Sequence, residues 1–367
     1  MEVSDFTPFQ YPADDIKAEW RTTHFDYHSI DQCLLKLDIL GHSDPTQLRL
    51  IAKQSNTDVL KVPMDDKETM SLFTSTKALG VTTKQIMCNT GTLGIPEFGT
   101  PFTIKLVEDT KPTTFGELVK ISGLSHGTDV WLGNAQKLIE KKVVPFKETI
   151  GCRDDIMVNL MYNGIEPIEA FQIMEFVRKG RASKDPDVWK KYVKIMEEGN
   201  IPKWFIKSCQ KIKYMFPKAH AAAYVISAFR IAWYKVHMPV YFYSSWYSSK
   251  AVDVEIDSMI KGYDSIKKKI EEIEEKGYEA SNKEMNQLES LRIGLEATAR
   301  GIKFLNVDLY NSEATDWVVK NDNEIYPPFN SIDGLGDTVA HNIVRERKKK
   351  PFISIEDIQH RAKIFKH

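Results

Sequence analysis

Between Glu198 and Asp253 the sequence contains no aspartate or glutamate, although the whole 367-residue chain has a formal net charge of −1. This absence excludes a site built on several carboxylates within the stretch itself. The stretch instead carries cations and rings: Lys203, Lys207, Lys211, Lys213, Lys218, Arg230, Lys235, Lys250, Trp204, Phe205, Tyr214, Phe216, Tyr224, Phe229, Trp233 and Tyr234. Positive charge interleaved with aromatic rings is typical of surfaces that hold phosphates and stack bases.

Two further features are scarce. The sequence has four cysteines and no C-x-x-C pair, which excludes a disulfide framework and a cysteine zinc site. Its most apolar run, residues 221–247, is interrupted by charged residues and a proline, which excludes a membrane span. The first ten residues do not resemble a secretory leader. We therefore expect a soluble, cytoplasmic protein with no membrane partner.

The sequence pattern predicts a mainly α protein with a small α+β part at the N-terminus. CLLKLDIL (33–40) has the alternation of a strand and is followed by a turn at Asp44-Pro45. Thr114 and Glu117 predict a capping box at the start of a helix. Further helices are expected over 130–140, 154–162, 167–179, 187–198, 203–215 and 219–236, and a helical hairpin between 253 and 301.

The most specific local motif lies near the C-terminus. Ile332-Asp333-Gly334-Leu335-Gly336 followed by Ala340 is typical of a helix-hairpin-helix, whose glycines bring helix amides close to a DNA phosphate. An ordinary turn between two helices is the alternative, and the basic residues downstream favour DNA. The predicted DNA-binding residues are Gly334, Leu335, Gly336, Arg345, Arg347 and Lys348.

Two groups of residues are candidates for holding a nucleotide. In FPKAHAAAYV, Lys218 lies at a helix start while His220 and Tyr224 share one helix face, so a triphosphate could bind at the start with its base on Tyr224. A buried helix with internally satisfied side chains is the alternative. Arg178, Lys179 and Arg181 surround Gly180 at a helix end, where cations also gather for electrostatic reasons alone.

Asp38 is the one unusual carboxylate. It lies in the predicted strand beside Lys36, on the face opposite Leu35, Leu37 and Ile39. A carboxylate on a rigid strand suits a divalent metal, but such a site needs at least two. From the residues alone, a structural role remains the stronger alternative.

Longer runs carry a family resemblance. FQYPADDIKAEWRTTHFDYHSID, LLKLDILGHSDPT, GTLGIPEFGT, GCRDDIMV, IMEFVRKGR, KIKYMFPKAHAAAYV and PPFNSIDGLG resemble the C-terminal portion of the α subunit of bacterial replicative DNA polymerase III, of the PolC type. The resemblance implies the end of a polymerase palm (1–45), fingers (46–252), a helical hairpin and connector (253–320) and a helix-hairpin-helix duplex-binding domain (321–367).

The same resemblance implies a chemistry. It identifies the enzyme as a DNA-directed DNA polymerase, a nucleotidyltransferase that adds dNTPs to a primer 3′ end and releases pyrophosphate. Asp38 matches a catalytic carboxylate of a two-Mg²⁺ site. The other two palm carboxylates and the exonuclease domain are absent from this sequence. Arg178, Lys179, Arg181, Phe216, Lys218, His220 and Tyr224 match nucleotide-facing positions. Primer-template DNA, dNTP, the sliding clamp and other replisome subunits are the implied partners.

Two other function classes remain open at this point. A non-catalytic DNA-binding module would use the C-terminal hairpin and the basic helices without Asp38. A repair glycosylase would require a catalytic Asp or Lys shortly after the hairpin. The sequence determines neither the clamp contact nor the oligomeric state.

We expect this 367-residue polypeptide to bind duplex DNA but not to extend a primer, because one carboxylate cannot hold two metal ions. Its DNA affinity should fall steeply between about 50 and 200 mM salt, as phosphate contacts release counterions. Primer-extension and DNA-titration assays check both expectations. Metal-dependent synthesis, or an affinity insensitive to salt, would contradict them.

Overall fold

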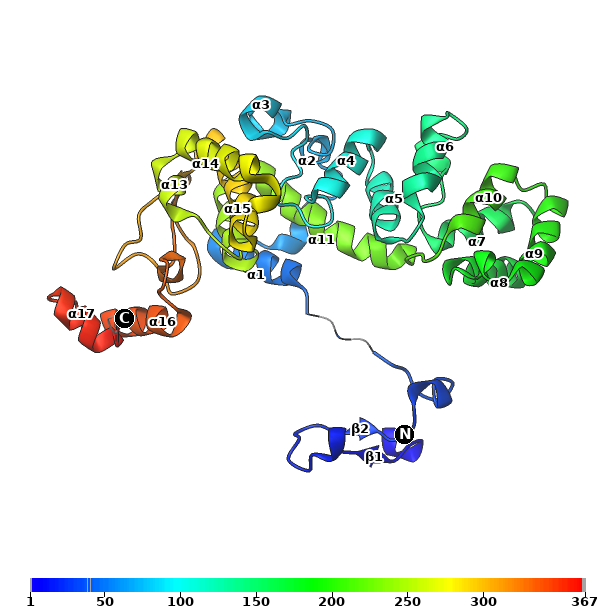
Figure 1. Ribbon diagram of the computed structural model, residues 1–367, viewed down its shortest axis with the longest axis horizontal. Helices are drawn as coiled ribbons and strands as arrows, with labels where there is room; N and C mark the ends of the chain where they lie inside the picture. The colour runs from blue at the N-terminus through cyan, green and yellow to red at the C-terminus, as the bar shows by residue number, and fades with distance from the viewer. Residues whose placement is uncertain (1, 38, 40, 365–367) are drawn as a thin grey trace. The chain divides into compact units, whose positions relative to one another are not determined.

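The computed structural model describes residues 2–37, 39 and 41–364, and it divides into two units, Met1–His42 and Ser43–His367. The first unit contains one short antiparallel pair of strands, β1 (Phe9–Gln10) and β2 (Thr22–Thr23), together with 3-10 turns. The second unit is mainly helical and contains the remaining elements (Figure 1).

The strand expected over 33–40 is not formed by its described residues, and this prediction is wrong for residues 33–37 and 39. Leu35, Leu37 and Ile39 are 85%, 74% and 93% exposed, so the apolar face of the segment is uncovered. The physical reason is that a strand requires a partner for its backbone and cover for its apolar face. Asp38 lies outside the described residues.

The first half of the second unit is a succession of helices. They are α1 (Ser43–Ser55), α2 (Lys67–Ser71), α3 (Thr83–Ile86), α4 (Pro101–Thr110), α5 (Phe115–His126), α6 (Gln136–Glu140), α7 (Arg153–Tyr162), α8 (Pro167–Arg178), α9 (Pro186–Glu198) and α10 (Lys203–Lys211). The capping box of α5 is confirmed, since Thr114 and Glu117 exchange hydrogen bonds. Two predicted helices are shorter than expected, because Gly133 has a φ of +69° before α6 and the chain becomes extended at Ile212 after α10.

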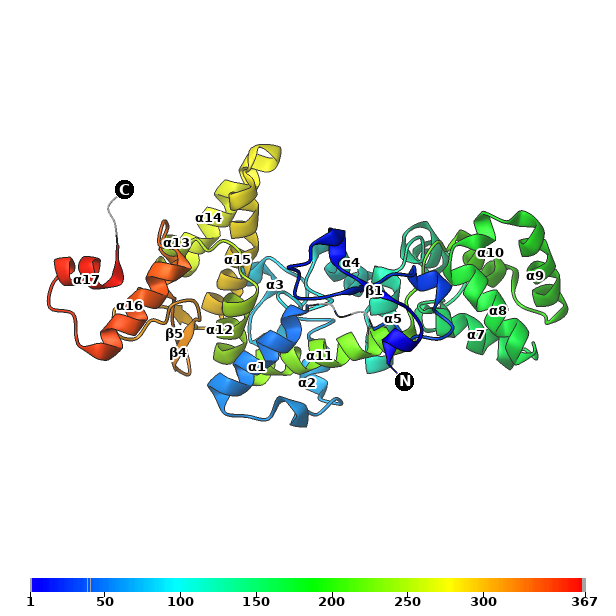
Figure 2. The same cartoon turned by 90° about the horizontal axis from the view of Figure 1, so that it is seen from below.

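The second half is built around α11 (Lys218–His237) and α12 (Pro239–Ser249). Next come α13 (Ile256–Lys261) and the antiparallel hairpin of α14 (Tyr263–Lys276) and α15 (Asn282–Ala299), which lie side by side in Figures 1 and 2. A small sheet of order β3-β5-β4 is formed by Lys303–Phe304, Glu324–Tyr326 and Val318–Asn321. The chain continues into α16 (Asp337–Lys349) and α17 (Ile355–Ala362).

Helix α11 links two hydrophobic cores. Val225 and Phe229 are buried in a core formed mostly by α5 to α10. Ile231 and Tyr234, further along α11, are buried in a second core with α12, α14 and α15. The N-terminal end of α11 is therefore held in a fixed position by packing along the rest of the helix.

A buried ion pair joins α11 to α15. Lys235 Nζ lies 2.7 Å from Glu296 Oε1, and both side chains are fully buried. Lys235 also donates to the carbonyls of Gly91 and Leu93 at 2.7 and 2.6 Å, and Tyr243 Oη donates to Glu296 at 2.8 Å. Burial lowers the pKa of Lys235, and the nearby Glu296 opposes that shift. The pair attaches the glycine-rich loop before α4 to the central helices.

Substituting Glu296→Gln leaves the buried Lys235 ammonium without its counter-ion. We expect the free energy of unfolding to fall by about 3 kcal/mol, the usual cost of breaking a buried pair from one side. Glu289→Gln, on an exposed position of the same helix, is the matched control and should change stability little. Urea unfolding measures both; equal effects of the two substitutions would contradict a structural role for the pair.

Candidate nucleotide and nucleic-acid interface

The loop of residues 212–217 gives the candidate site its shape. Helix α10 ends early because this loop pairs with the end of α5 instead of continuing as helix. Lys213 N donates to Thr128 O and Thr128 N donates to Tyr214 O, both at 3.0 Å. Gly180 lies directly beside the loop: its φ is +67°, and a Cβ there would lie 2.5 Å from Lys213 O. Only glycine fits this backbone approach.

A row of rings runs from this loop onto α11. The centroids of Tyr214 and Phe216 are 5.5 Å apart, those of Phe216 and His220 5.0 Å, and those of His220 and Tyr224 4.5 Å. Tyr214 and His220 are exposed, and Phe216 and Tyr224 are half-buried. His220 and Tyr224 share a face because they are four residues apart on a helix. We call these four residues the aromatic row.

A cation cluster lies at the adjoining end of the α7–α8 hairpin. Arg178 donates to both carboxylate oxygens of Glu175, Lys179 Nζ lies 3.1 Å from Oε2, and Arg153 lies 3.7 Å from Oε1. The pKa of Glu175 is lowered to about 2, chiefly by its hydrogen bond from Arg178. We call Arg153, Glu175, Arg178 and Lys179 the Glu175 cluster.

Backbone hydrogen bonds connect the Glu175 cluster to the aromatic row. Met215 N donates to Arg178 O at 3.3 Å, and Arg153 N donates to Phe216 O at 3.1 Å. The structure thus places Arg178 beside Met215, and Arg153 beside Phe216, whose ring contacts His220. These pairs lie far apart in the sequence, which gave no signal of Arg153 or Glu175 as neighbours.

We expected the amides at the start of α11 to be available to an anion, but the first of them is already bonded. Lys218 N donates to Asp154 Oδ2 at 2.7 Å, and Lys218 Nζ lies 3.4 Å from Asp155 Oδ1. Asp154 therefore already caps the helix from α7. Arg181 is exposed in the 3-10 turn Arg181–Ser183, and its side chain has no hydrogen-bond or ion-pair partner within the described part of the chain.

Two residues that the sequence reasoning missed support the aromatic row from the other side. The ring of His126 lies 5.4 Å from that of Phe216, and His126 Nε2 lies 2.5 Å from Glu97 Oε2. Ser122 Oγ donates to the same oxygen of Glu97 at 3.2 Å. The hydrogen bond with Glu97 raises the pKa of His126. The unusual glycine- and threonine-rich composition of residues 91–100 was the only available signal.

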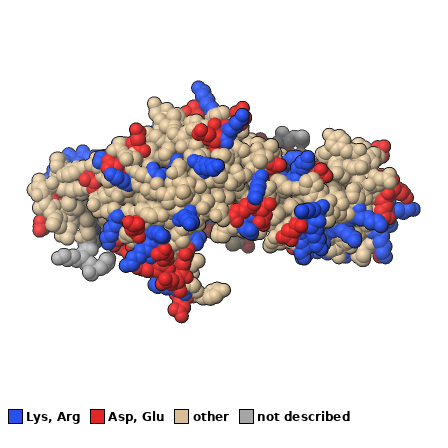
Figure 3. Space-filling view, turned by 90° about the horizontal axis from the view of Figure 1, so that it is seen from above, with Lys and Arg blue, Asp and Glu red and all other residues tan. Residues whose placement is uncertain are grey.

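The expectation that the cations of the acid-free stretch line a phosphate-holding surface is wrong for Lys235, which is fully buried, and other lysines of the stretch are paired with carboxylates. Lys235 is buried against Glu296, and Lys250 lies 2.7 Å from the buried Asp44. Lys213 pairs with Asp129 at 2.6 Å. Carboxylates from other parts of the chain pair with these lysines. Figure 3 shows blue and red side chains interspersed over the visible face.

The C-terminal motif forms a tight turn into α16. Gly334 has a φ of +81°, which favours glycine, whereas Gly336 has an ordinary φ of −75° at the N-cap of α16. No atom would lie within 4 Å of a Cβ at either glycine, so the turn is open to a ligand. Leu335 packs partly against the small core of this region. Asn330 donates to Asp337 in the first turn at 3.0 Å.

The predicted basic residues of this region divide into two kinds. Arg345 and Lys348 are exposed, and Arg345 donates to Asn342 Oδ1 at 2.7 Å. Arg347 is only 7% exposed and binds Leu309 O, Ser312 O and Glu313. We therefore correct the assignment of Arg347: it holds the preceding loop and does not face outward.

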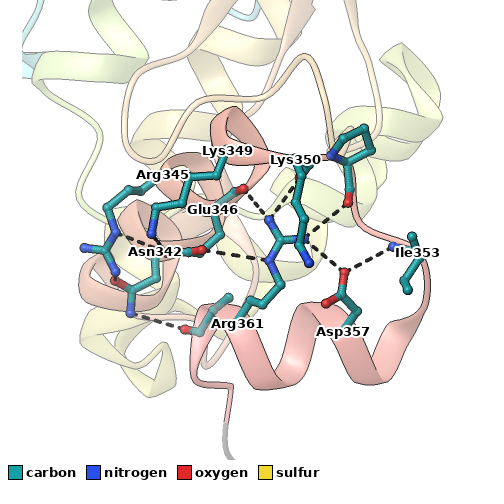
Figure 4. A network of polar contacts seen from close by, with 10 residues as sticks. Asn342, Arg345, Glu346, Lys349, Lys350, Ile353, Asp357 and Arg361 are labelled. Carbon is teal, nitrogen blue, oxygen red and sulfur yellow. Dashed lines mark hydrogen bonds and ion pairs between the residues drawn. The ribbon is translucent and has the colours of Figure 1, made fainter.

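Arg361 is a residue that the sequence reasoning missed, and Figure 4 shows it at the centre of the contacts between α16 and α17. It donates to Asp357 Oδ2 at 3.0 Å and to Lys350 O at 2.9 Å, and its guanidinium lies 4.3 Å from the ring centroid of Phe352. Asn342 donates to Ala362 O at 3.2 Å. These contacts fix α17 against α16.

Comparisons with known proteins identify the family. Residues 44–200 match the bacterial DNA polymerase III alpha subunit finger domain, and residues 301–367 match a helix-hairpin-helix motif. The chain is 56% identical over 365 residues to the DNA polymerase III PolC-type of Oceanobacillus iheyensis and 54% identical over 366 residues to that of Bacillus subtilis. The chain belongs to the PolC-type DNA polymerase III family.

The matches cover a much larger share of this chain than of its relatives. The matches extend over 100% of this chain but only 25% of each of the two relatives, so the chain spans about a quarter of their length. The finger match contains the Glu175 cluster, and the helix-hairpin-helix match contains Gly334 to Lys348. None of the described helices is long and apolar enough to span a membrane.

The different φ angles of the two turn glycines allow a paired test on this polymerase-family chain. Gly336→Ala should leave folding unchanged but weaken duplex binding about tenfold, because its methyl group would lie where the backbone approaches a phosphate. Gly334→Ala should lower both stability and binding, because it imposes a positive φ on alanine.

Thermal unfolding and DNA titration of each variant make the comparison. Lys320→Ala, a half-exposed lysine paired with Glu324 on the small sheet, is the binding control. Unchanged DNA affinity in Gly336→Ala would contradict the assignment of this turn to the duplex interface.

Proposed function

We propose that this chain supplies the nucleotide-holding and duplex-holding parts of a replicative DNA polymerase, whose reaction adds a dNTP to a primer 3′ end and releases pyrophosphate. The observation that carries the proposal is the convergence of the Glu175 cluster and the aromatic row around the 212–217 loop. Membership in the PolC-type family supports the same activity for the longer protein.

The arrangement suits a deoxynucleoside triphosphate. Arg178, Lys179 and Lys218 present positive charge where the negative charge of a departing pyrophosphate increases. The rings of His220 and Tyr224 offer a stacking surface that accepts every base, which template-directed synthesis requires. Arg181, which lies beyond Gly180, has a guanidinium with no partner among the described residues, and it would extend the cationic surface.

Magnesium is implied by the family, and we assign no ligand set for it in the described residues. No three His, Cys, Asp or Glu side chains converge there in a metal-binding arrangement. Asp38 stays a proposed ligand and catalytic carboxylate on the strength of the resemblance alone. A bound divalent ion would stabilise the attacking and leaving oxygens.

The N-terminal unit fits the role of a palm segment. The alternating apolar residues of 33–39 are exposed, as expected of a strand that joins a sheet formed by another part of the polymerase. We propose the limits 1–45 for this palm part, 46–252 for the fingers, 253–320 for the connector and 321–367 for duplex binding. Through the turn at Gly334–Gly336, Arg345 and Lys348, the last part would hold the backbone of primer-template DNA.

The remaining expectations belong to the intact protein. We propose that it acts in the cytoplasm with a sliding clamp and other replisome subunits. These proposals rest on the family, since the described surface identifies no residue for such partners.

Substitution of Lys179 and Lys218 by alanine in an intact polymerase containing this sequence tests the proposed function. We expect the KM for dNTP to rise about tenfold for each, because each removes a charge-assisted phosphate contact. DNA affinity should remain unchanged. Lys190→Ala, on an exposed position of α9, is the matched control.

Steady-state kinetics and DNA titration are measured on the same preparations. A fall in DNA affinity with an unchanged KM for dNTP would instead favour a non-catalytic DNA-binding role for the central basic residues.

A further inference from the structure

Glu175 occupies the position in the cation cluster where a phosphate would be expected. It is a carboxylate with a 20% exposed side chain, and it contacts cations on three sides: Arg178 in bidentate geometry, Lys179 and Arg153. Arg153 is the first residue of α7, and Arg178 is the last residue of α8. The carboxylate therefore lies where the two ends of the hairpin meet.

This arrangement offsets part of the cluster's positive charge from within, since one carboxylate faces three cations. A bidentate arginine–carboxylate pair is among the stronger hydrogen-bonded pairs in proteins, and a phosphate binds arginine in the same geometry. The low pKa of Glu175 keeps the carboxylate charged throughout the physiological range. The Nε and Nη2 donors that Arg178 uses on Glu175 cannot make the same two hydrogen bonds to a phosphate at the same time.

We propose that Glu175 is a resident counter-ion, which the phosphates of an incoming nucleotide displace and which recovers its cations when pyrophosphate leaves. This inference rests on the proposed function and assigns a positioning residue to the same site. In the empty site Glu175 holds the arginines in a fixed orientation. During binding it competes with the triphosphate, and after the reaction it assists release of the product.

The geometry sets the order of exchange. Lys179 has a 47% exposed side chain and a single contact with the carboxylate, so its contact with Glu175 is the easiest to exchange. Arg178 is less exposed and holds both oxygens, so it moves second. Arg153, at 3.7 Å, retains a weaker contact that keeps the displaced carboxylate from becoming unpaired.

Neighbouring carboxylates do not replace Glu175 in this role. Asp154 caps α11, and Asp155 accepts the backbone amides of Gly151 and Cys152 while facing Lys120 and Lys218. Both are held by backbone hydrogen bonds that a phosphate has no means to supply. Within the described part of the chain, the Glu175 carboxylate is held by side-chain cations alone, which makes it exchangeable.

The experiment measures binding of inorganic pyrophosphate to the 367-residue chain by calorimetry, for the unmodified protein and for Glu175→Gln. Glutamine preserves the size of the side chain and removes the competing charge. We expect pyrophosphate affinity to increase about three- to tenfold, the size of an effect expected for one partly exposed charge pair. Glu169→Gln, an exposed position on the same helix, is the control and should leave the affinity unchanged.

A second variant separates charge from folding. Glu175→Asp retains the charge but shortens the side chain, so it should disturb the bidentate contact and increase the affinity less than glutamine does. Thermal unfolding verifies that each variant is folded. In an intact polymerase, Glu175→Gln should lower the KM for dNTP and strengthen inhibition by pyrophosphate.

The outcomes distinguish this inference from the proposed function. Weaker or unchanged pyrophosphate binding in a folded Glu175→Gln variant, with clear binding by the unmodified chain, would overturn the counter-ion role alone. If neither protein binds pyrophosphate or dNTP, the nucleotide site itself is overturned. Tighter binding in Glu175→Gln but not in Glu169→Gln supports both.

Discussion

The buried pair of Lys235 and Glu296 is the constraint on which the rest of the second unit depends. Removing two charges from water is costly, and further hydrogen bonds offset part of that cost: the lysine donates to the carbonyls of Gly91 and Leu93, and the carboxylate accepts from Tyr243. These partners come from distant parts of the chain. Because these contacts hold α11 in place, they also hold the aromatic row at its N-terminal end.

The charge around the lysines of residues 199–252 depends on which residues lie near them in the fold, and not on their neighbours in the sequence. The stretch from residue 199 to 252 has no acid of its own, yet four of its seven lysines pair with Asp44, Asp129, Asp155 and Glu296 from other elements. Nearby carboxylates therefore offset part of the positive charge of this stretch. On the proposed function, a nucleotide or duplex would bind these paired cations by exchanging partners, so their affinity for phosphate would be lower than a count of lysines implies.

The sequence located much of the candidate site through short-range signals. Helical periodicity places His220 and Tyr224 on one face, and the glycine–leucine–glycine turn places Gly334 and Gly336 before a helix. Both depend on spacing within a few residues. The strand, over residues 33–37 and 39, and the long helix through 215 were mispredicted for the opposite reason. The strand needs partners elsewhere, and the helix ends because the following loop pairs with Thr128.

By itself the sequence determined the helical class, the family and the identity of the cationic and aromatic residues, because these follow from local periodicity and from residue type. Only the tertiary structure decided which charges are available. It assigned Arg347 and Arg361 to internal contacts, Glu97 and His126 to the support of Phe216, and Glu175 to the centre of three cations. Contacts between distant residues depend on how helices pack, and spacing along the chain does not encode that packing.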